Sequence, residues 1–320
     1  MRIARYFAIL SMGFALPAGT WAQDFKVTLL GTGSPLPIAE RFGAATLVEA
    51  GQEKLLFDVG RGATIRLNQV GVPIGALNAV FLTHFHSDHT SGIPDLWLTG
   101  WIGRYYGNRQ QPFRIIGPTG TAALMQNLER AYADDIRIRL ADEKNPAEGI
   151  AISPVEFAKD GVAYEANGVR VTAFEVDHGD LIKPAYGYRV DYDGRSVIIS
   201  GDTRYSKNLE THAQDATLVI HEVAIANQEY YDKTPIVKYI MAHHITPDEA
   251  GSLFARLQPK LAAYTHLVFL GAPGYPAPKV ADIERKTRET YSGPLALGTD
   301  LMAFDVRKDQ VIVIPDASKK

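Results

Sequence analysis

The most constraining feature of this 320-residue chain is a cluster of histidines that directly follows a short apolar segment. Residues Ala79–Leu82 are all apolar, which is typical of a buried β-strand, and Thr83-His84-Phe85-His86-Ser87-Asp88-His89 comes next. Packing four groups of this kind together costs free energy unless a cation organises them. Imidazole and carboxylate ligands without thiolate suit Zn²⁺, Mn²⁺ or iron, so the pattern predicts a metal site. The candidate ligands in this run are His84, His86, Asp88 and His89.

The amino-acid composition narrows the chemistry further. The chain contains no Cys, which excludes disulfides, zinc–thiolate sites, iron–sulfur clusters and a cysteine nucleophile. Its formal net charge of −3 gives no overall attraction for nucleic acid or for an anionic membrane. With 46% hydrophobic and 22% charged residues, the composition is that of a globular protein.

The first 22 residues have the pattern of a secretory signal peptide. Two arginines precede a mostly apolar stretch, Tyr6–Ala18, and the small residues Thr20 and Ala22 suit cleavage after position 22. The alternative is an uncleaved anchor or a buried first helix. We therefore predict a signal peptide at 1–22, a mature domain at 23–320, and export to the periplasm or secretion. No later stretch reaches 18 apolar residues, so no membrane partner is expected after cleavage.

The rest of the chain alternates between strand-like and helical patterns, and no low-complexity linker divides it. Two strand-rich halves, each with helices, predict one domain in which two sheets pack face to face with helices outside. We expect strands at 25–30, 45–49, 54–57, 79–82, 169–174, 186–192, 195–199, 217–220, 261–264, 302–306 and 311–314. We expect helices at 61–70, 119–132, 247–257 and 279–290.

Residues 134–168 form the least regular part of the sequence. They contain eight acidic side chains and only four basic ones. The segment is either an acidic insertion or lid, or an ordinary solvated connection.

The motif His84-Phe85-His86-Ser87-Asp88-His89 resembles the metal-binding motif of the metallo-β-lactamase superfamily. The resemblance extends, in order, along nearly all of the mature chain. It implies an α/β fold, the four-layer αββα sandwich of that superfamily, with the site at one edge of the sheets. The other matching motifs are Leu30–Pro35, Phe57–Gly60, Asp177–Gly179, Ser200–Thr203 and Thr265–Leu267.

By this resemblance, seven side chains bind two divalent metal ions, with zinc preferred and manganese or iron as alternatives. The first ion takes His84, His86 and His178, the second takes Asp88, His89 and His266, and Asp202 bridges them. Seven nitrogen and oxygen ligands can hold two ions about 3.5–4 Å apart and can lower the proton affinity of a bridging water. The aspartate of the second motif, Asp58, is expected to support the metal loop without binding metal.

Two further motifs resemble those of the ribonuclease Z and arylsulfatase branch of the superfamily. Residues Val219–Ala224 resemble its His-Glu-Ala-Thr motif, and His244 matches its later His-x-Thr motif. The resemblance implies that Glu222 and His244 form a pair beside the metals, in which the histidine donates a proton or stabilises an oxyanion. Asp88 is expected to orient the attacking hydroxide. The alternatives are that the pair is structural, or that His243 replaces His244 through a register slip of one residue.

These motifs predict an exported dinuclear metallohydrolase that cleaves sulfate or phosphate esters, including diesters, by attack of a metal-bridging hydroxide. The expected partner is a small-molecule anionic ester, as for an arylsulfatase or a phosphodiesterase. One alternative is a lactonase or another carboxylic-ester hydrolase of the same superfamily. A second alternative, from another class, is a non-catalytic metal-binding protein. The resemblance also allows a homodimer.

Ribonuclease Z activity, and with it a nucleic-acid partner, is not expected from the sequence. Residues 134–168 are acidic where ribonuclease Z has a basic arm that grips tRNA, and a signal peptide would separate the protein from tRNA. The motif at Thr265–Leu267 also lacks the Arg-Tyr pair that follows the last ligand in many ribonuclease Z sequences.

Aromatic residues after the histidine cluster suggest one wall of the site. Trp97 and Trp101 are four residues apart on one helical face, and Tyr105 and Tyr106 follow. They form either an apolar wall for an aryl leaving group or part of the core.

Overall fold

The computed structural model describes residues 25–103 and 105–319, so the predicted signal peptide at 1–22 lies outside the described residues. Fifteen strands in the described part form two mixed sheets, one of eight strands and one of seven. Among the described residues, no helix is both long enough and apolar enough to cross a membrane.

The first sheet has the strand order β15-β14-β1-β2-β3-β4-β5-β6, and its strands β3 to β6 are parallel. Its strands are β1 (Phe25–Gly31), β2 (Ala45–Ala50), β3 (Glu53–Phe57), β4 (Ala79–Phe81), β5 (Phe113–Pro118), β6 (Ile152–Phe157), β14 (Ala303–Val306) and β15 (Val311–Ile314).

The second sheet has the order β13-β12-β11-β10-β9-β8-β7, and its strands β10 to β13 are parallel. Its strands are β7 (Gly161–Ala166), β8 (Val169–Glu175), β9 (Tyr186–Tyr192), β10 (Arg195–Ile199), β11 (Leu218–Ala226), β12 (Leu261–Leu270) and β13 (Leu295–Leu297).

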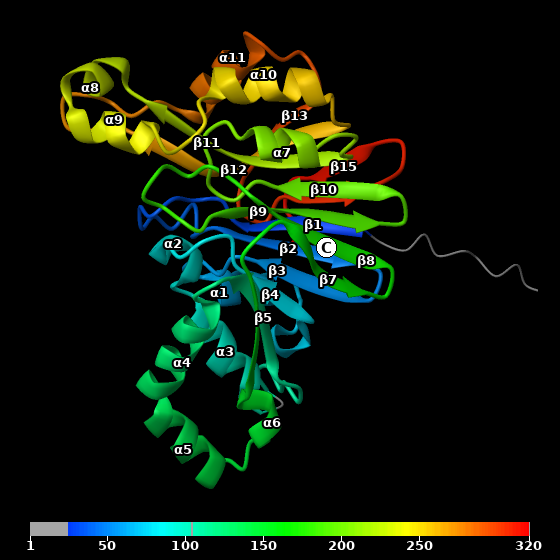
Figure 1. Cartoon of the computed structure of the whole chain (residues 1–320). Coiled ribbons are helices and arrows are strands. Elements are labelled where there is room, and N and C mark those ends of the chain that lie inside the picture. Colours follow the sequence, from blue (N-terminus) through cyan, green and yellow to red (C-terminus); the bar gives the residue numbers. More distant parts are fainter. Residues whose placement is uncertain (1–24, 104, 320) are drawn as a thin grey trace, which may run out of the picture.

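Helices cover the outer faces of both sheets, which confirms the predicted αββα sandwich (Figure 1). On the first sheet lie α1 (Ala63–Gln69), the 3₁₀ turn η1 (Ile74–Ala76), α3 (Ile93–Trp101) and α4 (Thr121–Ala131), and beyond them α5 (Ala133–Ala141) and α6 (Ala147–Ile150). On the second sheet lie α7 (Lys207–His212), α10 (Pro247–Leu257) and α11 (Val280–Arg288). The helices α2 (Ser87–Thr90), α8 (Gln228–Lys233) and α9 (Pro235–Met241) lie toward one edge of the sheets.

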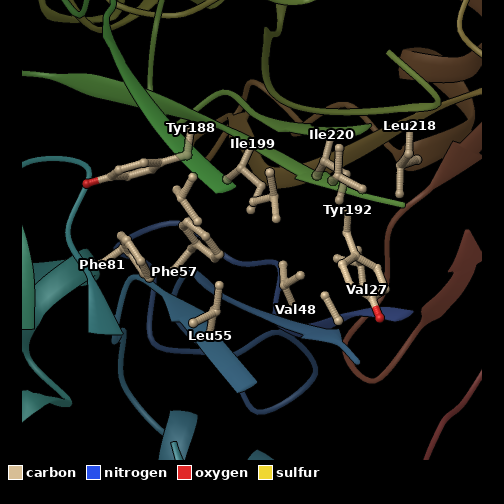
Figure 2. Close-up of a cluster of buried hydrophobic side chains, with 14 of the residues drawn as sticks. Val27, Val48, Leu55, Phe57, Phe81, Tyr188, Tyr192, Ile199, Leu218 and Ile220 are labelled. Carbon is tan, nitrogen blue, oxygen red and sulfur yellow. The ribbon is translucent and has the colours of Figure 1, made fainter. Parts of the chain in front are cut away.

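The two-residue alternation of the strands explains how each sheet serves two cores. Leu55 and Phe57 of β3 point between the sheets, whereas Leu56 points toward the helices α1 and α3. Between the sheets, the rings of Phe57 and Phe81 stack with their centroids 4.7 Å apart, and Tyr188 of the second sheet packs against both (Figure 2). Fully burying one such side chain contributes about 1.5–3 kcal/mol.

The predicted acidic insertion is mostly regular structure. Residues 134–168 contain most of α5, all of α6, and the edge strands β6 and β7, one in each sheet. The sequence hides these strands because edge strands are partly exposed, so they lack the continuous apolar pattern of a buried strand. The acids in and just after α5 are paired locally: Arg139 lies 3.1 Å from Asp135 and 2.7 Å from Glu143.

Candidate metal centre

The predicted ligands come together at the edge of the sandwich where several strands end, on the left of Figure 1. Parallel strands bring their carboxyl ends to one edge, so loops that are distant in sequence meet there. His84 and His86 follow β4, Asp88 and His89 lie in α2, His178 follows β8, Asp202 follows β10, and His266 lies within β12.

A β-bulge turns His266 toward this edge. Between the pairs His221–Tyr264 and Val223–Leu267, β12 advances by three residues while β11 advances by two. The extra residue in β12 disrupts the strand, and His266 takes a φ of 44°. Such bulges re-aim a side chain within a sheet. The predicted strand ended at residue 264, because the polar residues Thr265 and His266 follow its apolar run.

Asp202 Oδ2 faces imidazoles of both predicted metal sites. It lies 3.3 Å from Nε2 of His89 and 3.4 Å from Nε2 of His266. The same atom lies 3.7 Å from Nε2 of His178 and 3.9 Å from Nε2 of His84. This position, between two groups of imidazoles, is the one that a bridging carboxylate needs.

The remaining candidate ligands lie within reach of these groups. One set of atoms within 4.8 Å of one another comes from His84, His86, His178 and Asp202, and another comes from Asp88, His89 and His266. Nε2 of His266 is 3.1 Å from Oδ2 of Asp88. The seven residues that the sequence singled out are therefore together in space, in the predicted grouping.

Asp58 orients the histidine loop through hydrogen bonds on the side away from the cluster. Its Oδ1 accepts a hydrogen bond from the backbone N–H of Thr83 at 2.9 Å, and its Oδ2 accepts one from the Thr83 hydroxyl at 2.8 Å. The same Oδ2 lies 2.7 Å from Nδ1 of His89, which leaves Nε2 of that ring to face the cluster. Asp58 has a φ of 59°, a conformation that Asp adopts more readily than most residues.

Several buried atoms of the cluster have no hydrogen-bond partner among the described residues. They include Nε2 of His84, Nε2 of His89 and Oδ1 of Asp202. Leaving a buried polar atom unpaired costs about 1–3 kcal/mol. Divalent cations would satisfy all three atoms, so the residues present fit two metal ions bound by nitrogen and oxygen.

The protonation states of the cluster also suit cations. Burial lowers the pKa of His84 well below its ordinary value and the pKa of His178 to about 4, so both rings keep a free lone pair. Burial opposes ionisation of Asp202, but His266 and His89 hold the pKa of that carboxyl well below its usual value. Despite burial, Asp202 and Asp58 raise the pKa of His89, so a bound metal ion must displace its proton.

Glu222 and His244 form a buried pair next to the cluster. Oε2 of Glu222 lies 3.1 Å from Nδ1 of His244, and its Oε1 accepts hydrogen bonds from the backbone N–H groups of Ile245 and Thr203. Burial disfavours the protonated ring, but the Glu222 carboxylate raises the pKa of His244 to about 9. A ring nitrogen of His244 lies within 4.8 Å of ligand atoms of Asp202 and His266. The pair therefore presents a proton donor to the cluster.

The neighbouring residue His243 does not occupy this position. Its backbone oxygen lies 3.0 Å from Nδ1 of His178, and its half-buried ring lies at the edge of the pocket. There is accordingly no register slip between the two histidines.

The cluster opens into a pocket of about 730 Å³ with mostly apolar walls. The walls include the loop 35–38, Ile240 of α9 and residues 268–270 of β12. These wall residues were not among the predicted site residues. Its only local signal is the segment Pro35-Leu36-Pro37-Ile38, in which Leu36 and Ile38 alternate with prolines and are exposed.

The predicted aromatic wall is not part of this pocket. Trp97 and Trp101 are fully buried, and their indole N–H groups donate to backbone oxygens of Ile150 and Pro146. These two indoles are core side chains, because four-residue spacing on a helix marks the buried face as readily as a binding face.

Comparison with known proteins places the chain among metallohydrolases. Residues 55–267 match the family model described as the beta-lactamase superfamily domain. The ribonuclease Z of Mycobacterium marinum is 33% identical over 283 residues, which cover 88% of this chain and 98% of that protein.

Solved structures show the same fold. The metallo-beta-lactamase fold protein YhfI from Bacillus subtilis has a TM-score of 0.66 and 21% identity, over 88% of this chain and 98% of that one. The short form of human tRNase Z has a TM-score of 0.65 and 21% identity, over 88% of this chain and 99% of that one.

These relatives correct three predictions. The predicted exported hydrolase of small sulfate or phosphate esters is wrong, because the curated relatives are named ribonuclease Z. The exclusion of nucleic acid is wrong for the same reason, since the names of these relatives state that they act on RNA. The predicted export to the periplasm or outside the cell is also wrong, because it was made for a protein class other than that of these ribonuclease Z relatives. The lactonase and non-catalytic alternatives gain no support from these relatives.

Proposed function

Because the chain belongs to the metallo-β-lactamase superfamily, as a metal-dependent hydrolase in the branch that holds ribonuclease Z, we propose that it hydrolyses phosphodiester bonds in RNA. The observation that carries the proposal is the pair of Glu222 and His244 beside Asp202, in a chain 33% identical to ribonucleases Z over 283 residues. Cleaving an RNA strand requires a proton for the leaving oxygen, and a protonated His244 can supply it.

In this proposal, the metal ligands are the seven clustered side chains, and zinc is the preferred ion. Two ions bound there supply Lewis-acid polarisation of the phosphodiester and an activated water. Asp202 lies between the two imidazole groups and holds them in a common geometry.

Asp88 is proposed to orient the attacking water. Burial opposes its ionisation, but a hydrogen bond with His266 lowers the pKa of Asp88. The ionised carboxylate can therefore accept a hydrogen bond at neutral pH. Glu222 is a positioning residue: it fixes the His244 ring through Nδ1 and keeps it protonated. The other nitrogen of His244 is then free to donate to the leaving oxygen.

The test uses the purified chain with a 3′-extended tRNA precursor and with bis-p-nitrophenyl phosphate. We expect both to be cleaved, EDTA to abolish both reactions, and Zn²⁺ or Mn²⁺ to restore them. Asp202→Asn should lower both metal content and turnover, whereas His212→Gln, which replaces a histidine stacked on Phe174, should keep both. If the metal-loaded wild-type protein cleaves no RNA, the proposed function is wrong.

A further inference from the structure

A second pocket, of about 330 Å³, opens next to the metal centre, and His244 lines both. Its walls come from the end of β11, from α8 and α9, from the start of α10 and from Lys286 of α11. In Figure 1, α8 and α9 lie at the upper left, and α10 and α11 lie at the top. His244 is therefore the residue that the two pockets share.

Two lysines in this pocket have no carboxylate partner. Lys238 is exposed, with its Nζ 5.7 Å from the centroid of the Tyr231 ring, and Lys286 is half-buried. Within residues 25–103 and 105–319, no carboxylate oxygen lies within 4.0 Å of either ammonium group. At the half-buried Lys286, an ammonium group without a counter-ion costs free energy, which an anion in the pocket would recover.

The other charged groups of the pocket are mostly paired elsewhere. Arg204 lies 2.9 Å from Asp177, and the Glu249 carboxylate accepts hydrogen bonds from the backbone N–H and the hydroxyl of Thr246. Asp248 is exposed and lines the pocket, where it opposes an anion. The two lysines therefore provide the positive charge that is not already paired. The carboxylates of Asp248 and Glu249 oppose an anion, since Glu249 has only neutral hydrogen-bond partners.

The position of His244 decides what this pocket receives, and the argument at this step rests on the proposed function. A proton donated by His244 goes to the leaving oxygen. The part of the RNA attached to that oxygen must therefore lie next to His244. The second pocket, which His244 also lines, then offers space for the next nucleotide. Tyr231 offers an aromatic surface of the kind on which nucleobases stack.

We infer that the pocket lined by Lys238, Lys286 and Tyr231 binds the nucleotide on the leaving side of the scissile phosphate. Its ligand is RNA, held by one phosphate group between the two lysines. No covalent step occurs in this pocket, which positions the strand so that the leaving oxygen meets His244.

The experiment compares wild type with Lys238→Gln/Lys286→Gln on two substrates. One is an RNA that extends beyond the scissile bond, and the other is thymidine 5′-(p-nitrophenyl phosphate), whose leaving group carries no phosphate. We expect the KM for RNA to rise about tenfold or more and its salt dependence to weaken. The kcat and KM for the nitrophenyl substrate should stay within about twofold, which also reports that the variant is folded.

Two further variants sharpen the result. Lys159→Gln/Lys260→Gln removes two exposed lysines elsewhere, and its KM for RNA should match the wild-type value. Asp248→Asn removes the opposing carboxylate, and its KM for RNA should fall. If the wild type cleaves RNA but the variant lacking Lys238 and Lys286 keeps its KM, the assignment of this pocket is wrong while the proposed function stands. If the wild type cleaves no RNA, both are wrong.

Discussion

Replacing Asp58 by Asn should weaken metal binding although Asp58 is not among the candidate ligands. The carboxylate accepts three hydrogen bonds, two from Thr83 and one from Nδ1 of His89, at 2.7–2.9 Å. Asn tolerates the φ of 59° at this position, so the backbone can stay as it is. The change therefore isolates the hydrogen bonds.

An amide cannot replace the carboxylate in either orientation. If its oxygen faces the Thr83 backbone N–H, its NH₂ group faces Nδ1 of His89, and that ring must then carry its proton on Nε2. A proton on Nε2 blocks the lone pair that faces Asp202, which lies 3.3 Å away. If the amide is flipped, the NH₂ group faces the Thr83 N–H and that hydrogen bond is lost.

The expected losses follow from these bonds. Losing one hydrogen bond to a charged group should lower the free energy of unfolding of the metal-free protein by about 1.5–3 kcal/mol. Changing the group that orients a metal-binding histidine should weaken zinc binding about 10- to 100-fold. Urea unfolding in EDTA measures the first effect, and competition for Zn²⁺ with a chromophoric chelator measures the second.

Asp300→Asn is the matched control. Asp300 has a side chain that is only 4% exposed and accepts hydrogen bonds from Thr32, Phe42 and Arg66, but none of these bonds involves a candidate ligand. This variant should lose stability and keep zinc affinity. Wild-type zinc affinity in Asp58→Asn would refute the argument that Asp58 sets the tautomer of His89.

Three more predictions follow from single contacts. Glu222→Gln should lower kcat on RNA about 100-fold or more and leave zinc content unchanged, measured by turnover and metal analysis. Hydrogen bonds from Arg256 and Tyr205 lower the pKa of Glu210 to about 2, so its ionised form stabilises the fold above the ordinary pKa of 4.5, and this contribution is lost as the pH falls toward 2. The stability gap between wild type and Glu210→Gln, about 2 kcal/mol in urea at pH 7, should therefore shrink below pH 4.5. Gly201→Ala should cost at least about 1 kcal/mol in urea, because φ is 60° and the new Cβ would lie 2.6 Å from the Tyr186 carbonyl oxygen.

Local patterns were enough to predict much of the sandwich. The hairpin between β9 and β10 turns at Asp193-Gly194, where both residues have positive φ, as the sequence of this turn favours. The helix Pro247–Leu257 begins with a capping box from Thr246 and Glu249, and its predicted and observed bounds agree. These features depend on neighbours in sequence, so a single sequence contains them.

The parts that were missed depend on tertiary contacts. The strands β11 and β12 each run six residues beyond their predicted ends, because each pairs with the other along that extension. That extension holds Glu222 and His266, so the site geometry depends on it. The motifs located both residues, but neither motif nor periodicity indicates the bulge that turns His266.

The exclusion of a nucleic-acid partner relied on charges counted along the sequence, whereas binding depends on the charges that lie close together in the folded protein. The acids in and just after α5 interact with Arg137 and Arg139 of that helix, at 3.3 Å and less. Charges separated by more than about 10 Å of salt solution have little influence on each other. A net charge of −3 therefore does not describe the field near His244, where Lys238 and Lys286 come from helices about 50 residues apart in sequence. The ligand motifs specify the reacting centre, whereas the choice of ester depends on side chains that only the fold brings together.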